Sequence, residues 1–267
     1  MCGIIGIVGT SPVAGRLIDS LRRLEYRGYD SAGVAVVDHG EIVRRRAPGK
    51  LRNLEGVLVE SPLNGAVGIG HTRWATHGAP TERNAHPHRA GRVAVVHNGI
   101  IENFAELKRE LVAEGRTFAS DTDTEVVAHL IDRALGEGLA PIAALKATLD
   151  RITGAYALAV LIEGEPNLIL AARRGPPLVV GYGDGEMYIG SDAVAVGPFT
   201  SRVAYLEEGD YVAIDHDTAT IFDASGATVE RVIRVVPAAA AMVDKGNYRH
   251  FMAVSYTHLT LPTIYSV

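Results

Sequence analysis

The order of strand-like and helix-like segments constrains the fold of this chain more than any other feature. Apolar runs typical of buried strands occupy much of the first hundred residues, and a second series of strand-like runs begins at Gly154. Turn residues separate the closely spaced runs of the second series, which favours antiparallel pairing. Three helical patterns, starting near Asn103, Asp123 and Pro141, lie between the two series. This arrangement predicts an α+β layered domain rather than a regular βαβ alternation.

Composition narrows the classes of function. The 267 residues carry a formal net charge of -5, so charge gives no reason to expect nucleic acid or an anionic membrane as a partner. The single cysteine excludes an internal disulfide framework and suits a reducing compartment. The apolar run at the N-terminus is too short for a signal peptide or a membrane span, so we expect a cytoplasmic protein. Arg44-Arg45-Arg46 is the only tight basic run, and a solvated strand end explains it better than a phosphate site does.

The single cysteine is Cys2, which directly follows Met1. Its small size allows the initiator methionine to be removed, which would give Cys2 a free α-amine beside its thiol. A thiolate is a strong nucleophile, and a terminal amine is a base that can activate one. Position alone favours the alternative, a small and inert core residue. Cys2 is therefore a candidate nucleophile that needs support from other residues.

The most concentrated polar stretch, His71 through Gly78, directly follows an apolar strand. It includes Arg73, Trp74, Thr76 and His77, and loops at strand ends commonly carry binding groups. The guanidinium of Arg73 suits a carboxylate, which it can bind through two parallel hydrogen bonds. A structural pairing of Arg73 with a carboxylate of the protein is the equally acceptable alternative.

Asn98 and Gly99 end another apolar strand. A side-chain amide followed by a glycine N–H is the usual material of an oxyanion hole. Asn-Gly is also a common hairpin turn, and the turn is the better interpretation of these two residues alone.

Three carboxylates, those of Asp121, Asp123 and Glu125, lie at the start of a predicted helix. Helix capping and the helix dipole explain acidic residues there without any function. A substrate with an α-ammonium group would change this interpretation, because Arg73 and one aspartate would then bind the two charges of an amino acid.

Five histidines lie close together in the sequence, at positions 71, 77, 86, 88 and 97. Pro87 hinders His86 and His88 from converging on one ion, and neither an HExxH motif nor a second cysteine accompanies them. No dinucleotide or phosphate-binding glycine motif occurs either. We therefore expect neither a metal ion nor any other cofactor.

Taken together, these segments resemble the glutaminase half of glucosamine-6-phosphate synthase, also called glutamine–fructose-6-phosphate aminotransferase. The resemblance covers residues 1 to about 252, with the segments in the expected order. The segments that carry it are Cys2-Gly3-Ile4, Leu24 through Gly33, His71 through Gly78, Asn84 through His88, His97 through Asn103, Thr122 through Glu125, Leu206 through Asp210, Asp244-Lys245-Gly246 and Tyr248-Arg249-His250. The segments Leu24 through Gly33 and His71 through Gly78 look more like the synthase than like amidophosphoribosyltransferase or asparagine synthetase.

The resemblance implies an N-terminal-nucleophile hydrolase fold, a four-layer αββα sandwich with two antiparallel sheets. It implies that Cys2, freed at its amine, attacks glutamine, and that Asn98 and the backbone of Gly99 form the oxyanion hole. Arg73 and Asp123 would hold the carboxylate and the ammonium group of glutamine.

Other residues receive supporting roles from the same resemblance. Thr76 and His77 would line the glutamine pocket, and Trp74 would lie on a mobile loop that covers it. Arg27 would support the N-terminus.

The resemblance also divides the chain. We expect an amidotransferase domain at residues 2–236, the start of a linker at 237–252, and a foreign or frameshifted tail at 253–267, with the isomerase region of the family absent. The expected partners are L-glutamine and the isomerase domain of the full-length enzyme. This chain alone is expected to be a monomer, and the full-length parent a homodimer.

Two alternatives stay open. The chain could supply ammonia to a different acceptor as the domain of another class II amidotransferase. It could also be a relic that binds glutamine without turnover, and retention of Met1 would favour that outcome because it blocks the amine.

Overall fold

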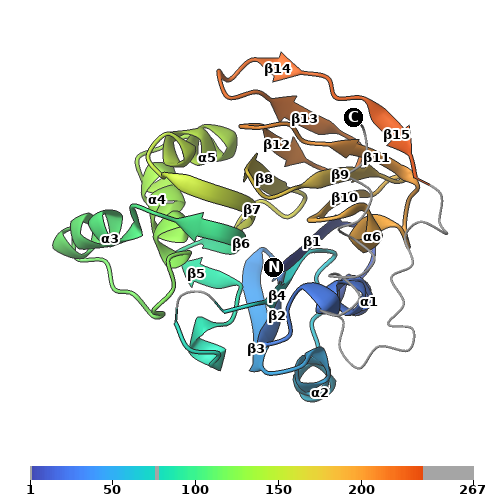
Figure 1. The fold of residues 1–267 in the computed structure, drawn as a ribbon, viewed down its shortest axis with the longest axis horizontal. Helices are drawn as coiled ribbons and strands as arrows, with labels where there is room; N and C mark the ends of the chain where they lie inside the picture. Colours follow the sequence, from blue (N-terminus) through green and yellow to red (C-terminus); the bar gives the residue numbers. More distant parts are fainter. Residues whose placement is uncertain (1, 76–77, 237–267) are drawn as a thin grey trace, which may run out of the picture.

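The computed structural model describes residues 2–75 and 78–236. Within these ranges two antiparallel sheets stack between layers of helices (Figure 1). The first sheet has eight strands, in the order β15 (Ile233–Val235), β11 (Arg202–Tyr205), β9 (Val179–Tyr182), β10 (Met187–Gly190), β1 (Gly3–Val8), β4 (Val67–Arg73), β2 (Ser31–Asp38) and β3 (Glu41–Pro48). The second has seven strands, in the order β14 (Thr228–Val229), β13 (Ala219–Phe222), β12 (Tyr211–Ile214), β8 (Ile169–Arg174), β7 (Gly154–Ile162), β6 (Val93–Ile101) and β5 (His88–Ala90).

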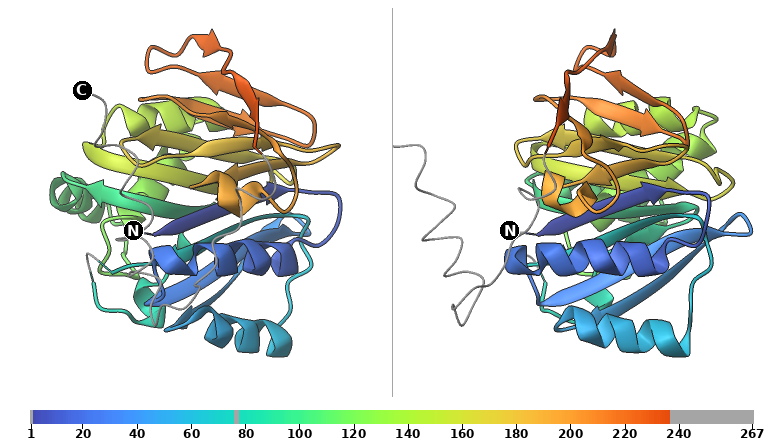
Figure 2. Two further views of the ribbon diagram at one scale, coloured as in Figure 1. Left: turned by 45° about the vertical axis from the view of Figure 1, so that its right-hand side comes forward. Right: turned by 90° about the vertical axis from the view of Figure 1, so that its right-hand side faces the viewer.

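Helices cover the outer face of each sheet. The outer face of the first sheet packs against α1 (Ala14–Leu24), α2 (Leu51–Glu60) and the short α6 (Ala193–Val196). The outer face of the second packs against α3 (Phe104–Ala113), α4 (Glu125–Gly136) and α5 (Pro141–Leu149). Figures 1 and 2 show the two helical groups on opposite sides of the stacked sheets. The predicted four-layer αββα sandwich is confirmed.

The inner core lies between the two sheets. Successive residues of a strand point to opposite faces, so alternate positions of each strand supply this core. Apolar side chains of both sheets fill it, including Ile4, Ile69, Val96, Ala159 and Ile189. The same alternation determines which polar side chains point inward where the strands end.

Two features of the helices were not anticipated from the sequence. The sequence reading omitted α2, whose ten residues include Gly56 and whose N-terminus has no side-chain cap. Asn103 precedes α3 but does not cap it, because its side chain binds the backbone at Arg151 and Thr153 instead.

The basic run on β3 was predicted to be a solvated strand end, and this prediction is wrong. All three guanidinium groups are half-buried and donate to backbone carbonyl oxygens. The bonds join Arg44 to Pro87 (3.1 Å), Arg45 to Ser61 (3.1 Å) and Arg46 to Ala85 (3.0 Å). Carbonyl groups that leave water need a donor, so these arginines stabilise the neighbouring loops.

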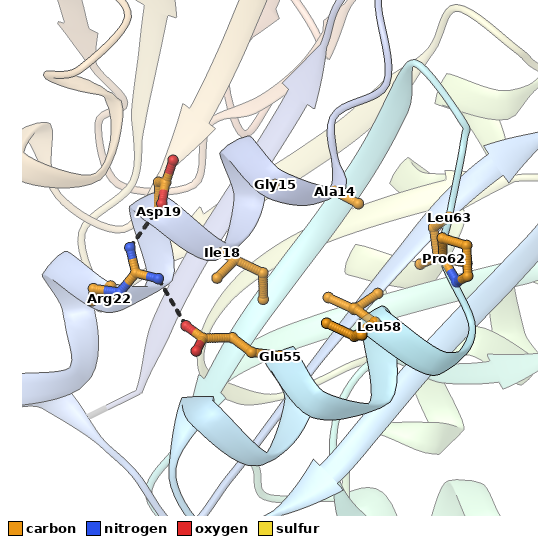
Figure 3. Close-up of a pocket in the computed structure, with 10 residues that line it drawn as sticks. Ala14, Gly15, Ile18, Asp19, Arg22, Glu55, Leu58, Pro62 and Leu63 are labelled. Atoms are coloured by element: carbon orange, nitrogen blue, oxygen red, sulfur yellow. Dashed lines mark hydrogen bonds and ion pairs between the residues drawn. The ribbon is translucent and has the colours of Figure 1, made fainter.

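An open pocket of about 380 Å³ lies between α1 and α2 on the outer side of the first sheet (Figure 3). Its apolar wall includes Ile18 and Leu58, and Arg22 closes one end by pairing with both Asp19 and Glu55 at 2.8 Å. In the part of the chain that the structure describes, no helix has the length and apolar character needed to cross a bilayer.

Candidate active site

Polar residues replace the apolar inner core where β1, β4 and β6 approach one another. Cys2 directly precedes β1, and it lies two positions from the inward-facing Ile4. His71 and Arg73 continue the inward-facing positions of β4, which pairs with β1 so that His71 lies opposite Ile4. On the second sheet, Asn98 continues the inward-facing positions of β6. The strand alternation therefore brings these four polar side chains to the same end of the sandwich.

The Cys2 sulfur contacts the backbone of Trp74. The Trp74 N–H donates a hydrogen bond to Sγ at 3.1 Å, and the Trp74 carbonyl oxygen lies 3.5 Å from the same sulfur. Burial raises the pKa of the Cys2 thiol, although the Trp74 hydrogen bond and the positive charge of Arg73 act in the opposite direction. A thiol with a raised pKa is mostly protonated near neutral pH, so it needs a base before it can attack.

Asn98 links the two sheets at the sulfur. Its Nδ2 donates to the backbone carbonyl oxygen of Cys2 at 3.0 Å, and its Oδ1 lies 3.0 Å from Nε2 of His71. The side chain is buried. An amide donor is thus held next to the nucleophile candidate.

Gly99 does not form the hairpin turn that Asn-Gly suggests. Asn98 and Gly99 pair with Ala157 and Tyr156 inside the ladder between β6 and β7, so the turn interpretation is wrong. Gly99 adopts a φ of 126°, and a Cβ at this position would overlap the carbonyl oxygen of Ala155. Only glycine fits this backbone without strain, which places an uncrowded peptide group beside Cys2.

Arg73 and Asp123 line one small pocket together with Cys2. The Arg73 guanidinium donates to the carbonyl oxygens of Ala79 (3.3 Å) and Gly78 (3.1 Å), and burial lowers its pKa from the usual arginine value. Asp123 is 4% exposed, and its Oδ2 accepts the backbone N–H of Ile101 at 2.8 Å. The pocket therefore presents one cation and one anion near the sulfur.

A second cavity of about 400 Å³ opens on another side of Cys2. Its lining is mostly apolar, from Trp74, Ile100, Pro176 and Pro177, and it also includes Arg27. Cys2 is therefore reached from a charged pocket and from an apolar cavity.

Arg27 lies in the wall of the apolar cavity without a hydrogen bond to Cys2 among the described residues. Its guanidinium pairs with Asp192, which caps α6 by accepting from Val194 N–H at 3.1 Å. The neighbouring Ser191 hydroxyl accepts the N–H of Ile4 at 3.0 Å. Arg27 thus contacts the segment that holds the start of β1.

The first residues after β4, Trp74 and Ala75, contact the neighbouring segment at Tyr29 and Asp30. The Ala75 N–H donates to Asp30 at 2.8 Å, and the Trp74 ring meets the edge of the Tyr29 ring with centroids 6.1 Å apart. Thr76 and His77, both predicted to line the glutamine pocket, lie outside the described residues.

Histidines and hydroxyl groups form a buried network behind the site. His86 accepts the His97 N–H at 3.2 Å, and its other ring nitrogen lies 3.3 Å from Thr124 Oγ1. His88 Nε2 lies 3.1 Å from Thr122 Oγ1. Burial lowers the pKa of His88 to about 3 and that of His86 well below its usual value. Among residues 2–75 and 78–236, no three His, Cys, Asp or Glu side chains are grouped to hold a metal ion.

Sequence reasoning gave no role to His71, Asp30 or Ser191. His71 was recognisable from the alternation Val67, Ile69, His71, which places it inward. Asp30 and Ser191 act through backbone N–H groups distant in sequence, and no local pattern marks them.

The comparisons with known proteins agree with this geometry. Residues 71–197 match the glutamine amidotransferase domain family. The chain is 73% identical over 252 residues to the glutamine–fructose-6-phosphate aminotransferase [isomerizing] of Caulobacter vibrioides and 60% identical over 252 residues to that of Mesorhizobium japonicum. Each match covers 94% of this chain, which spans only 42% of the length of either relative.

Solved structures give the same result for the fold. The chain is similar to the glutamine phosphoribosylpyrophosphate amidotransferase of B. subtilis, with a TM-score of 0.73 and 26% identity. That similarity covers 85% of this chain and 50% of the other.

Proposed function

Because residues 71–197 match the glutamine amidotransferase domain family, we propose that this chain hydrolyses glutamine to glutamate and ammonia through Cys2. The observation that carries the proposal is the position of the Cys2 sulfur. It borders a pocket with one cation and one anion, and the Asn98 amide is held 3.0 Å from the Cys2 backbone. A nucleophile, an amide donor and a zwitterion-binding pair are the parts that amide hydrolysis of an amino acid side chain requires.

Glutamine binding depends on charge. Arg73 binds the α-carboxylate and Asp123 binds the α-ammonium group, which directs the side-chain amide toward the sulfur. The family resemblance adds Thr76 and His77 to this pocket and places Trp74 in the segment that covers it. Arg27 supports the start of β1 through its ion pair with Asp192.

The reaction proceeds in two steps. Removal of Met1 frees the α-amine of Cys2, which takes the thiol proton as sulfur attacks the amide carbon. The Asn98 amide and the Gly99 N–H stabilise the oxyanion, the C–N bond breaks, and the amine passes its proton to the leaving ammonia. Water then attacks the γ-glutamyl thioester, which releases glutamate and restores the thiol.

We further propose that the ammonia serves synthesis of glucosamine 6-phosphate from fructose 6-phosphate in the full-length enzyme. The names of the two relatives support this acceptor, and their length leaves room for a synthase region beyond the part matched here. On this basis residues 2–236 form the amidotransferase domain, 237–252 begin a linker and 253–267 form an unrelated tail. Residues 237–267 lie outside the described part of the chain.

A glutaminase assay tests the proposal. We expect the chain to release glutamate and ammonia in equal amounts, and Cys2→Ala to release neither. Alanine at position 2 also permits methionine removal, so this variant keeps the terminal amine and lacks only sulfur. Intact mass establishes whether Met1 is absent. Glutamine binding without turnover by a chain that has lost Met1 would refute catalysis and favour the binding relic. The acceptor is tested with the full-length enzyme, by measuring whether glucosamine 6-phosphate forms from glutamine when fructose 6-phosphate is present.

A further inference from the structure

We propose that His71 is a positioning residue that fixes the orientation of the Asn98 amide, so that Nδ2 rather than Oδ1 faces the reacting carbonyl. The inference rests on the proposed function, in which Asn98 stabilises the oxyanion, and it adds a residue to which the mechanism gives no role. Oxyanion stabilisation requires a donor aimed at the oxygen before the reaction begins.

The backbone of His97 determines the tautomer of His71. Nε2 of His71 lies 3.0 Å from the His97 carbonyl oxygen, which can only accept a hydrogen bond. Nε2 must therefore carry the proton. The other ring nitrogen, Nδ1, is buried and has no hydrogen-bond partner among the described residues, which agrees with an unprotonated nitrogen there.

The tautomer of His71 determines the orientation of Asn98. The same Nε2–H faces the Asn98 side chain at 3.0 Å, so the Asn98 atom on that side must be the acceptor Oδ1. The amide nitrogen then points the other way, toward Cys2, whose carbonyl oxygen it reaches at 3.0 Å. A flipped amide would place Nδ2 against the Nε2–H donor and Oδ1 against the Cys2 carbonyl oxygen. It would also place an oxygen where the negative oxyanion forms.

The surroundings hold His71 in this state. Its side chain is fully buried and stacks on the His86 ring, with centroids 4.2 Å apart and an angle of 20° between the planes. The charged and titratable groups facing it are His86, His97 and Arg73, and positive charge on His97 or Arg73 disfavours a second proton on the ring. Burial, the larger effect, lowers the pKa of His71 to about 3. A neutral imidazole donates from one nitrogen only, as the orientation of Asn98 requires.

The experiment is a double-mutant cycle on glutamine hydrolysis. We expect His71→Leu, which removes the donor, to lower kcat about 10- to 100-fold with KM changed by less than about threefold, in line with residues that orient catalytic groups. His71→Gln restores an N–H near the position of Nε2 and should recover most of kcat. In an Asn98→Ala background, His71→Leu should have no further effect, because the group that it positions is gone. His129→Gln, another buried histidine without contact to Asn98, should leave kcat unchanged.

The outcomes separate the two proposals. If Asn98→Ala lowers kcat while His71→Leu does not, or if the two losses multiply in the double variant, the positioning role is wrong and the proposed function stands. If wild-type protein has no glutaminase activity, the proposed function fails. An NMR measurement of the His71 ring nitrogens tests the geometry without activity and without a variant that must fold: protonated Nε2 is expected, and protonated Nδ1 would overturn the inference.

Discussion

The side-chain amide of Asn98 donates a hydrogen bond to the backbone carbonyl oxygen of Cys2, 3.0 Å away. The two residues come from different sheets, because Cys2 precedes β1 and Asn98 lies on β6. The proposed nucleophile and the proposed oxyanion donor are thus held together by the packing of the sandwich rather than by one loop. Changes that loosen the sandwich should therefore reduce turnover as well as stability.

Asn98→Ala should lower kcat for glutamine hydrolysis about 10²- to 10³-fold with little change in KM, because it removes one oxyanion donor. Arg73 and Asp123, which bind the substrate in our proposal, are untouched by this change. Steady-state measurement of ammonia release provides the test. An unchanged kcat would exclude Asn98 from the oxyanion hole.

Asp123→Asn should raise KM for glutamine about 10- to 100-fold, because the ammonium group loses a charged partner. Asparagine keeps an oxygen that can accept the Ile101 N–H, so the local backbone should hold. Asp121→Asn is the matched control, since Asp121 is an exposed carboxylate on the same segment, and its KM should equal that of the wild type. A normal KM for Asp123→Asn would place the ammonium site elsewhere.

The order of strand and helix patterns predicted the layered fold. A strand or helix that is buried on one face has apolar residues at regular spacing, and this spacing can be recognised in the sequence. The helix α2 was missed because its ten residues combine Gly56 with no capping side chain, so that packing rather than propensity stabilises it. Within the site, Cys2 and Asn98 could be nominated by chemical type. The contact of His71 with Asn98 could not be predicted in this way. It depends on how the two sheets stack on each other, and no local sequence pattern determines that.

Gly99→Ala should destabilise the protein by at least about 1–3 kcal/mol, because a non-glycine residue is strained at a φ of 126°. The added methyl group would also overlap the Ala155 carbonyl oxygen and disturb the pairing of β6 with β7. Urea unfolding gives the change in free energy. Gly56→Ala, in the middle of α2 with open space around its Cβ, should instead stabilise by about 0.5–1 kcal/mol. Equal stability of the Gly99→Ala variant and the wild type would contradict the strain argument.

The free energy of unfolding should begin to fall at a pH well above the range in which the carboxylates titrate. Burial lowers the pKa of His71 and of His88 to about 3 and that of His86 well below its usual value, whereas an unfolded histidine titrates near pH 6.5. Below about pH 6.5 the unfolded chain therefore binds protons that the folded chain excludes. The stabilisation is complete above that pH and is lost as the pH falls toward 3, at up to about 1.4 kcal/mol per pH unit for each histidine.

Urea unfolding at pH 7.5, 6.5 and 5.5 measures this loss as the slope of the free energy of unfolding against pH. His88→Gln should reduce the slope by about one proton, because one of the three rings with a lowered pKa no longer titrates in the unfolded chain. His39→Gln should leave the slope unchanged, since the His39 side chain is 98% exposed. Glu125 does not interfere in this range. Burial opposes its ionisation, but the neighbouring His129 side chain and hydrogen bonds from Ser120 and nearby backbone groups still lower its pKa to about 2, so its contribution is lost only below about pH 4.5. A free energy of unfolding that stays constant from pH 7.5 to 5.5 would mean that the buried histidines accept protons in the folded protein.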